Sequence, residues 1–175
     1  ALDNTKGRIF AYDFQGNMLY AFGGHGYKAG LFMNPSAIED IGDSLLVTDQ
    51  KLGTITQFTL TDYGKMINDG LAEYKKGNYD ESANIWRKVL KHNGNYDQAY
   101  IGIGRALLRE KNYKEAMEYF ELKLDAKNYS KAFKLYREVW FEENIGTILI
   151  IIAILLLLGF GVGFVKKARR EVEKG

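Results

Sequence analysis

Few residues in this sequence could carry out chemistry. Two of the 175 residues are histidine, His25 and His92, and none is cysteine, so a zinc site would need carboxylate ligands. The spacing Gly24-His25-Gly26-x2-Ala29 fits one variant of the dinucleotide-binding fingerprint, which needs a strand before it and a helix after it. Pro35 and a further β-rich run follow instead. The sequence therefore argues against a nucleotide site and predicts that His25 is a loop residue.

No other pattern indicates catalysis. The sequence contains no Ser–His–Asp set, no phosphate-binding loop and no cluster of metal ligands. Asp3-x3-Gly7-x-Ile9 recurs as Asp49-x3-Gly53-x-Ile55, which indicates that both aspartates cap turns. We therefore expect no enzyme activity, no catalytic residue, no metal and no cofactor. The net charge of +2 gives no reason to expect a nucleic acid partner.

An uncharged apolar run extends from Ile145 to Val165. As a helix it would be about 31 Å long, which matches a hydrocarbon core of about 30 Å. A helix buried in a soluble protein would have a polar face, and this run has none. The sequence therefore predicts a single transmembrane helix. Within it, Gly159 and Gly163 have the Gly-x-x-x-Gly spacing that lets two such helices pair, although glycine is common in membrane helices.

The charges beside this run predict its orientation. Glutamates precede it, and basic residues follow it, namely Lys166, Lys167, Arg169 and Arg170. Positive residues stay on the cytoplasmic side, so residues 1–144 should be extracytoplasmic and the tail cytoplasmic. The four basic residues act as topology determinants, and they could also contact anionic lipid.

A period of 34 residues dominates the chain from residue 63 to residue 143. The pairs related by this offset are Gly70 and Gly104, Tyr79 and Tyr113, Ser82 and Ala116, and Trp86 and Phe120. Each small residue at 82 or 116 precedes a large aromatic by four positions, which places both on one helix face. Asn78 with Glu81, and Asn112 with Glu115, predict capping boxes at two helix starts.

This pattern resembles the tetratricopeptide (TPR) family of helix–turn–helix repeats. Tyr100, Ile103, Gly104 and Leu107 occupy the positions of its Trp-x2-Leu-Gly-x2-Tyr sequence, and Ala116 and Phe120 those of its Ala-x3-Phe pair. The first repeat departs from the pattern with Asp69 at a leucine position, and neither repeat ends in proline. A third cue, Asn128-Tyr129 with Ala132 and Tyr136, predicts a final capping helix that continues into the membrane span.

The resemblance also implies a binding surface. In this family the first helix of each pair lines a concave groove, and in that register Lys75, Arg105 and Arg109 would face it. A basic groove would suit an acidic segment or a C-terminal carboxylate. The simpler interpretation is that three long basic side chains only solvate their helices.

Residues 1–62 have the pattern of short strands. The expected strands are Arg8–Asp13, Met18–Phe22, Ser36–Ile41, Ser44–Thr48 and Thr54–Leu60, with a turn at 15–17 and a glycine-rich loop at 23–30. The segment resembles the NHL-repeat family of β-propellers through Phe22, Gly23, Gly26, Gly30, Phe32, Pro35, Ile38, Val47 and Asp49. The resemblance covers about one and a half blades, too few to close a ring.

Together these features predict a multi-part α+β protein. Its order is a partial propeller (1–62), TPR-like hairpins with a capping helix (63–143), a transmembrane helix (144–165) and a basic tail (166–175). We expect a membrane-anchored scaffold that binds membrane or envelope proteins, such as components of a transport or export complex. The alternatives are a receptor whose propeller binds a glycan or small ligand, and a propeller lyase or hydrolase that the residues present do not support. The lysine-rich, cysteine-free composition indicates a bacterial cell surface, and the first residues suggest the C-terminal part of a longer protein.

Overall fold

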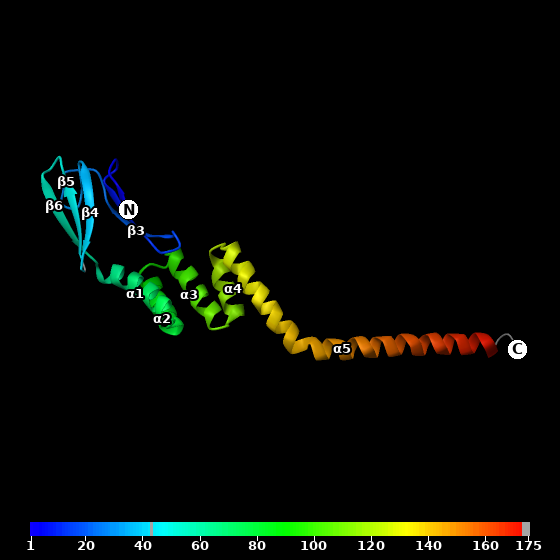
Figure 1. Cartoon of the computed structure of the whole chain (residues 1–175). Helices are drawn as coiled ribbons and strands as arrows, with labels where there is room; N and C mark the ends of the chain where they lie inside the picture. Colours follow the sequence, from blue (N-terminus) through cyan, green and yellow to red (C-terminus); the bar gives the residue numbers. More distant parts are fainter. Residues whose placement is uncertain (43, 173–175) are drawn as a thin grey trace.

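Two three-stranded antiparallel sheets come first in the chain. The computed structural model describes residues 1–42 and 44–172. The first sheet has the order β1-β2-β3 and the second β4-β5-β6 (Figure 1). The strands are β1 (Leu2–Asp3), β2 (Arg8–Tyr12), β3 (Met18–Gly23), β4 (Pro35–Ile41), β5 (Ser44–Asp49) and β6 (Thr54–Thr59). Five of the six were predicted to within one residue at each end, and only the two-residue β1 was missed.

Two matching turns connect β1 to β2 and β5 to β6. The Asp3 carboxylate accepts hydrogen bonds from the backbone N–H groups of Thr5 and Lys6, both at 3.0 Å. The Asp49 carboxylate does the same with the residues two and three positions later, both at 2.9 Å. Gly7 and Gly53 follow with φ of +64° and +63°, a conformation that glycine adopts without strain. The predicted turn-capping role of the two aspartates is therefore confirmed.

Asp49 also ties β5 to the loop before β4. Its second oxygen accepts from the backbone N–H groups of Met33 at 2.6 Å and Asn34 at 3.1 Å. Only 2% of Asp49 is exposed. Burial disfavours the charged form, but the hydrogen bonds outweigh it and hold the pKa of Asp49 below its ordinary value.

The shared turn relates the two sheets. The hairpin β1–β2 corresponds to β5–β6, with Asp3 paired to Arg8 and Asp49 paired to Thr54. The first sheet continues with β3, whereas the second is preceded by β4. Within the described residues the two sheets remain open and do not close into a propeller. No helix follows the glycine-rich loop, since β4 comes next, so the surroundings of a nucleotide fingerprint are absent there.

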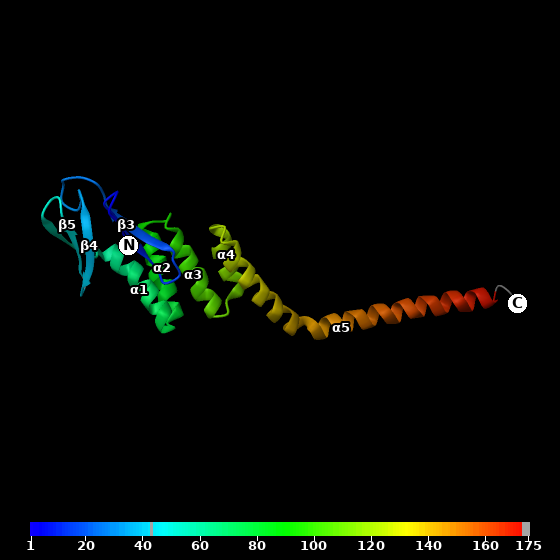
Figure 2. The ribbon, with the colours of Figure 1, turned by 45° about the horizontal axis from the view of Figure 1, so that its top comes forward.

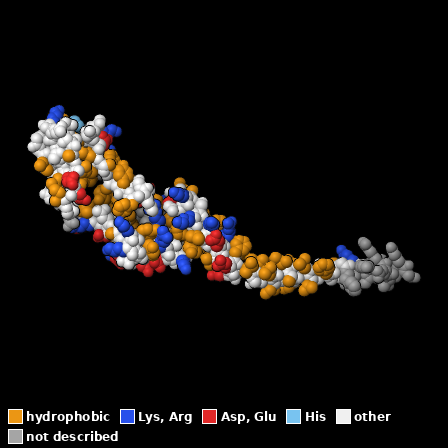
Figure 3. All heavy atoms as spheres, in the orientation of Figure 1, with side chains coloured by type: hydrophobic (Ala, Val, Ile, Leu, Met, Phe, Trp, Pro, Cys, Tyr) orange, Lys and Arg blue, Asp and Glu red, His pale blue; other side chains and the backbone are white. Residues whose placement is uncertain are grey.

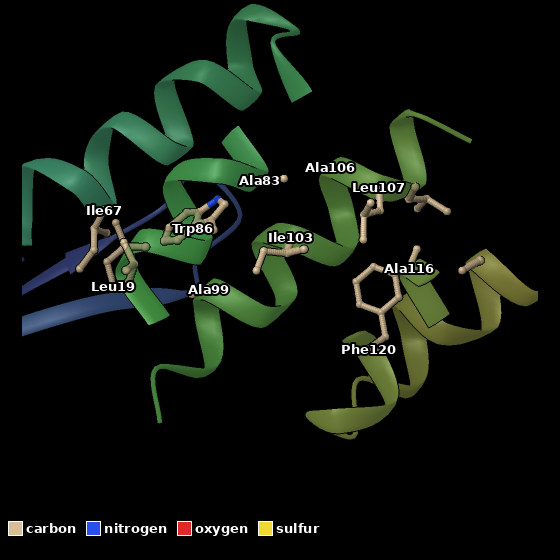
Figure 4. Packing of buried hydrophobic residues seen from close by; sticks show 13 residues of the cluster. Leu19, Ile67, Ala83, Trp86, Ala99, Ile103, Ala106, Leu107, Ala116 and Phe120 are labelled. Atoms are coloured by element: carbon tan, nitrogen blue, oxygen red, sulfur yellow. The ribbon is translucent and has the colours of Figure 1, made fainter. Parts of the chain in front are cut away.

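Four helices form two hairpins after the sheets. They are α1 (Asp62–Lys76), α2 (Tyr79–His92), α3 (Asp97–Arg109) and α4 (Tyr113–Leu122). Each helix packs against the next, and α4 packs against α5 (Ala126–Val172). Their shared core contains Ile67, Trp86, Ile103 and Phe120, all 2% exposed or less (Figure 4).

Large aromatic side chains lie against glycines in this core. A Cβ added to Gly70 would lie 2.9 Å from the Trp86 ring, and one added to Gly102 would lie 2.5 Å from it. In the second repeat, a Cβ added to Gly104 would lie 2.6 Å from the Phe120 ring. The Ser82 hydroxyl donates to the Gly70 carbonyl at 2.7 Å. The glycines thus allow the helices to approach closely, with Trp86 and Phe120 filling the space between them.

Two helix starts, those of α2 and α4, are where the sequence predicts, but their bonding differs. Thr61 caps α1 by accepting from the Gly64 N–H at 3.1 Å. Asn78 and Asn112 occupy the cap positions of α2 and α4, yet neither side chain accepts a cap hydrogen bond, so the predicted capping boxes are wrong. The two amides instead donate to carboxylates, Asn78 to Glu73 and Asn112 to Glu115, both at 2.6 Å. A hydrogen bond to an ionised carboxylate is stronger than one between two neutral groups.

The last helix is continuous over 47 residues, as predicted. Its first part packs on the helical core through Ala132, which is fully buried. It then bends and extends away from the rest of the molecule (Figure 1). Its later part is covered with exposed hydrophobic side chains (Figure 3). By length and composition this is the one helix among the described residues that could cross a membrane.

We predict that Gly104→Ala destabilises the helical repeats by about 1–3 kcal/mol, because the new methyl group would overlap the buried Phe120 ring. Alanine favours a helix over glycine by only about 1 kcal/mol, which is too little to compensate. The measurement is chemical unfolding followed by far-UV circular dichroism in detergent. Gly94→Ala is the control, since its Cβ would meet nothing closer than 3.9 Å. Equal unfolding midpoints for the two variants would contradict the packing described here.

Candidate partner-binding surface

The three basic residues expected to face a groove lie on α1 and α3 and contact groups of their own chain. Lys75 is in the last turn of α1, and Arg105 and Arg109 are in the second half of α3. We call Lys75, Arg105 and Arg109 the basic face. The Arg109 Nε donates to the Tyr74 hydroxyl at 3.2 Å, which joins α3 to α1.

A tight turn between β2 and β3 reaches the basic face. Its first residue is Asp13, whose carboxylate accepts from the backbone N–H groups of Gln15 and Asn17, both at 2.8 Å. The Asn17 side-chain amide donates to the second oxygen at 2.7 Å. These bonds give the turn a fixed shape, in which the Asp13 side chain is 6% exposed and Phe14 is 92% exposed. We call residues 13–17 the hairpin tip.

The hairpin tip presents an acid and an aromatic ring to two members of the basic face. An Asp13 oxygen lies 3.7 Å from the Arg105 guanidinium. The Lys75 ammonium lies 4.6 Å from the centre of the Phe14 ring, within the range of a cation–π contact. Both views of the ribbon place the blue hairpin beside α3 (Figures 1 and 2). The structure therefore brings Lys75 and Arg105 together around one turn of the same chain.

Hydrogen bonds and charge act together on Asp13. Burial disfavours its carboxylate, but hydrogen bonds from Asn17 and Gln15 and the charge of Arg105 outweigh burial. The pKa of Asp13 is therefore held below its ordinary value. Asp13 is negatively charged at neutral pH and complements the basic face.

The rest of the hairpin is anchored by burial. Leu19 of β3 is 7% exposed and belongs to the core of the helices. The Tyr96 hydroxyl donates to the Leu19 carbonyl at 2.8 Å, and the Tyr20 hydroxyl lies 3.4 Å from the Asn68 side-chain oxygen. Burial raises the pKa of Tyr96, so it remains a neutral donor. The hairpin is thus attached to the helices by contacts that lie outside its tip.

Sequence reasoning missed the partners of the basic face. The turn at 15–17 was predicted from Gln15-Gly16-Asn17, and Gly16 has φ of +84° as such a turn requires. Nothing local, however, relates Asp13 to Arg105 or Leu19 to the helical core. The only available signal was the opposite charge of an acidic turn and the basic residues expected in a groove.

The other predicted site residues lie in the helical core or on α5. Tyr79 and Tyr113 begin α2 and α4, each half-buried against the core, and Ala116 is fully buried. Gly159 and Gly163 lie on α5 with open space around them. Lys166 is exposed, while the side chains of Lys167, Arg169 and Arg170 lie outside the described residues.

A cleft of about 740 Å³ lies between the two sheets and α1. Its walls are mostly apolar and aromatic, and include Phe10, Tyr20, Phe22, Ile38 and Phe58. Over residues 1–42 and 44–172, no group of three or more histidine, aspartate and glutamate side chains is close enough to hold a metal ion. The walls of the cleft are suited to apolar or aromatic groups, and the basic face is suited to acidic ones.

We predict that Asp13→Asn lowers the stability at pH 7 by roughly 1 kcal/mol, since it removes a charged hydrogen-bond acceptor. Because the folded-state pKa of Asp13 is below the unfolded value, this contribution is present above the unfolded pKa and is lost as pH falls through the folded one. The difference between wild type and variant should therefore shrink below about pH 4.

The measurement is urea unfolding of both proteins between pH 7 and pH 3. Asp40→Asn, which changes an exposed carboxylate on β4, serves as the control and should cost less than 0.5 kcal/mol, roughly the scale of surface substitutions. A difference for Asp13→Asn that does not depend on pH would show that its charge has no part in holding the hairpin tip.

Comparison with known proteins finds a similarity for the helical part. The family model described as "Tetratricopeptide repeat" matches residues 68–131, which extend from α1 to the start of α5. No curated protein and no solved structure gives a significant match to the chain. The match confirms the resemblance for these helices, whereas no comparison supports an NHL repeat in the sheets. Residues 68–131 therefore form a region similar to tetratricopeptide repeats, which are non-catalytic modules for protein–protein interaction.

Proposed function

We propose that this protein is a membrane-anchored scaffold that holds a protein partner outside the cytoplasm, as an accessory of a membrane transport or export complex. The observation that carries the proposal is that a region matching tetratricopeptide repeats is joined, without a break, to an apolar helix long enough to cross a membrane. The same helix packs on the repeats and extends from them. In this proposal the repeats lie close to the membrane surface.

The residues before the apolar run support a membrane boundary there. Trp140 and Phe141 are exposed neighbours in edge-to-face contact, with ring centres 5.3 Å apart. Aromatic side chains are enriched where a membrane helix leaves the hydrocarbon core. The run from Ile145 to Val165 begins a few residues later. The acidic residues before it and the basic residues after it favour an extracytoplasmic position for the repeats and sheets, on a bacterial cell surface.

The two sheets supply a second surface in this proposal. Their shared Asp-x3-Gly-x-Ile turn supports the interpretation that they are parts of successive blades of an NHL-type propeller. The alternative function, a receptor that binds a glycan or small ligand, is favoured by the cleft of about 740 Å³ between them, because flat aromatic walls suit such ligands.

The orientation is tested by single cysteines, because the chain has none of its own. Ser130→Cys, an exposed position on α5, should react with a membrane-impermeant maleimide in intact cells. Lys166→Cys, beyond the apolar run, should react only after the membrane is permeabilised. The reverse pattern of labelling would overturn the extracytoplasmic placement.

The scaffold is tested by purifying the full chain from its native membranes in mild detergent and identifying the proteins that co-purify in stoichiometric amounts. We expect a membrane or envelope protein, with recovery reduced at least about tenfold by Arg105→Glu with Arg109→Glu, since truncating or reversing a key interface charge costs over 1 kcal/mol. Lys88→Glu with Lys91→Glu on α2 is a control of the same charge change.

Recovery of no stoichiometric partner would contradict the scaffold and direct attention to ligands of the cleft. A partner that the Arg105 and Arg109 changes leave in place would retain the scaffold and exclude the basic face as its binding surface.

A further inference from the structure

The basic face already has an occupant. Asp13 and Phe14 are consecutive residues at the hairpin tip, and they contact Arg105 and Lys75 respectively. A carboxylate beside a guanidinium and a ring beside an ammonium are complementary pairs. The surface on α1 and α3 therefore fits a specific chemical pattern, an acidic residue followed directly by an aromatic one in a tight turn.

We propose that the hairpin tip is an internal ligand of the basic face, and that a protein partner carrying an acidic–aromatic turn binds there by displacing it. This inference rests on the proposed function, because it names the chemistry of the partner that the repeats would hold. It also makes the tip a gate, since the basic face is open to a partner only when Asp13 and Phe14 leave it.

The contacts of the tip are of the kind that can exchange. The Asp13–Arg105 pair is 3.7 Å apart, beyond hydrogen-bond distance, with the Arg105 side chain 20% exposed and the Asp13 side chain 6% exposed. An ion pair without a hydrogen bond is weaker than a hydrogen-bonded one, and Phe14 buries almost none of its surface. A partner could therefore compete with the tip at little cost to the fold.

The remainder of the hairpin is independently secured. Leu19 lies in the helical core, and Tyr96 holds the Leu19 carbonyl. These contacts are on β3, whereas the contacts with the basic face are in the turn before it. The tip can leave the basic face while the sheet remains docked on the helices. Changes confined to Asp13 and Phe14 thus open the surface without removing the hairpin.

The probe for the test is a cyclic peptide with the sequence of residues 12–18, Tyr-Asp-Phe-Gln-Gly-Asn-Met, labelled with fluorescein. Its binding to the full chain in detergent micelles is measured by fluorescence anisotropy. The variant Asp13→Asn with Phe14→Ala should bind the peptide at least about tenfold more tightly than wild type, because the internal competitor has been weakened. Adding Arg105→Glu should remove this binding, whereas adding Lys88→Glu on α2 should not.

Three controls keep the result interpretable. The single change Phe14→Ala alters a residue that is 92% exposed, so it should have little effect on stability, and it should give tighter binding than wild type. Tyr27→Ala, at another exposed aromatic residue in the glycine-rich loop, should leave the affinity unchanged. A peptide with Asn for Asp and Ala for Phe should not bind.

Several outcomes would overturn the inference. These are equal affinity of wild type and the opened variants, peptide binding that survives Arg105→Glu, and a shift of the opened variant to a dimer with exchanged hairpins. The result separates this inference from the proposed function. If a native partner co-purifies but is not released by excess peptide, the proposed scaffold function stands and the proposed gate is rejected. Tight peptide binding to the opened variant without any native partner supports the gate and rejects the scaffold.

Discussion

Trp86 lies against the backbones of Gly70 and Gly102, and the positions of the first three helices depend on that contact. The indole side chain comes from α2 and meets glycines of α1 and α3, where any larger residue would overlap it. Phe120 and Gly104 repeat the arrangement one repeat later. Because the aromatic side chain fills the space that each glycine leaves, the spacing of neighbouring helices is fixed by van der Waals packing. The surface that α1 and α3 present together, including the basic face, follows from this spacing.

The first sheet docks on this stack through the hairpin β2–β3, and β6 of the second sheet leads directly into α1. Leu19 adds an apolar side chain to the helical core, Tyr96 and Tyr20 add polar contacts, and the hairpin tip adds charge complementarity. The hairpin therefore combines a buried, permanent attachment with an exposed, exchangeable one. With such an attachment, a partner would gain access to the basic face through local motion of a few residues, without any rearrangement of the helices.

The long last helix joins the helical repeats to an apolar segment long enough to cross a membrane. Its first part is held by α4 through Ala132, and its apolar part has none of its surface buried by the rest of the chain. A surface so apolar needs a nonaqueous environment, because leaving it in water opposes the hydrophobic effect. The backbone of such a helix is fully satisfied within itself, which is the condition for crossing lipid. The repeats and the apolar segment are therefore joined by one continuous helix. Packing on α4 holds the first part of this helix, and lipid would surround its later part.

The sequence by itself determined the elements and most of their limits. Five strands, both turns capped by Asp3 and Asp49, the 34-residue helical repeat and the continuity of the last helix all follow from patterns that act within a few residues, where backbone sterics and side-chain period decide the conformation. It was wrong about the capping boxes of Asn78 and Asn112, because each amide is oriented by donating to a nearby carboxylate. Only the tertiary structure decided that Asp13 and Phe14 contact Arg105 and Lys75. These residues meet because Leu19 docks in a core built by distant helices, and no local pattern in the sequence encodes a contact that depends on how separately formed elements pack.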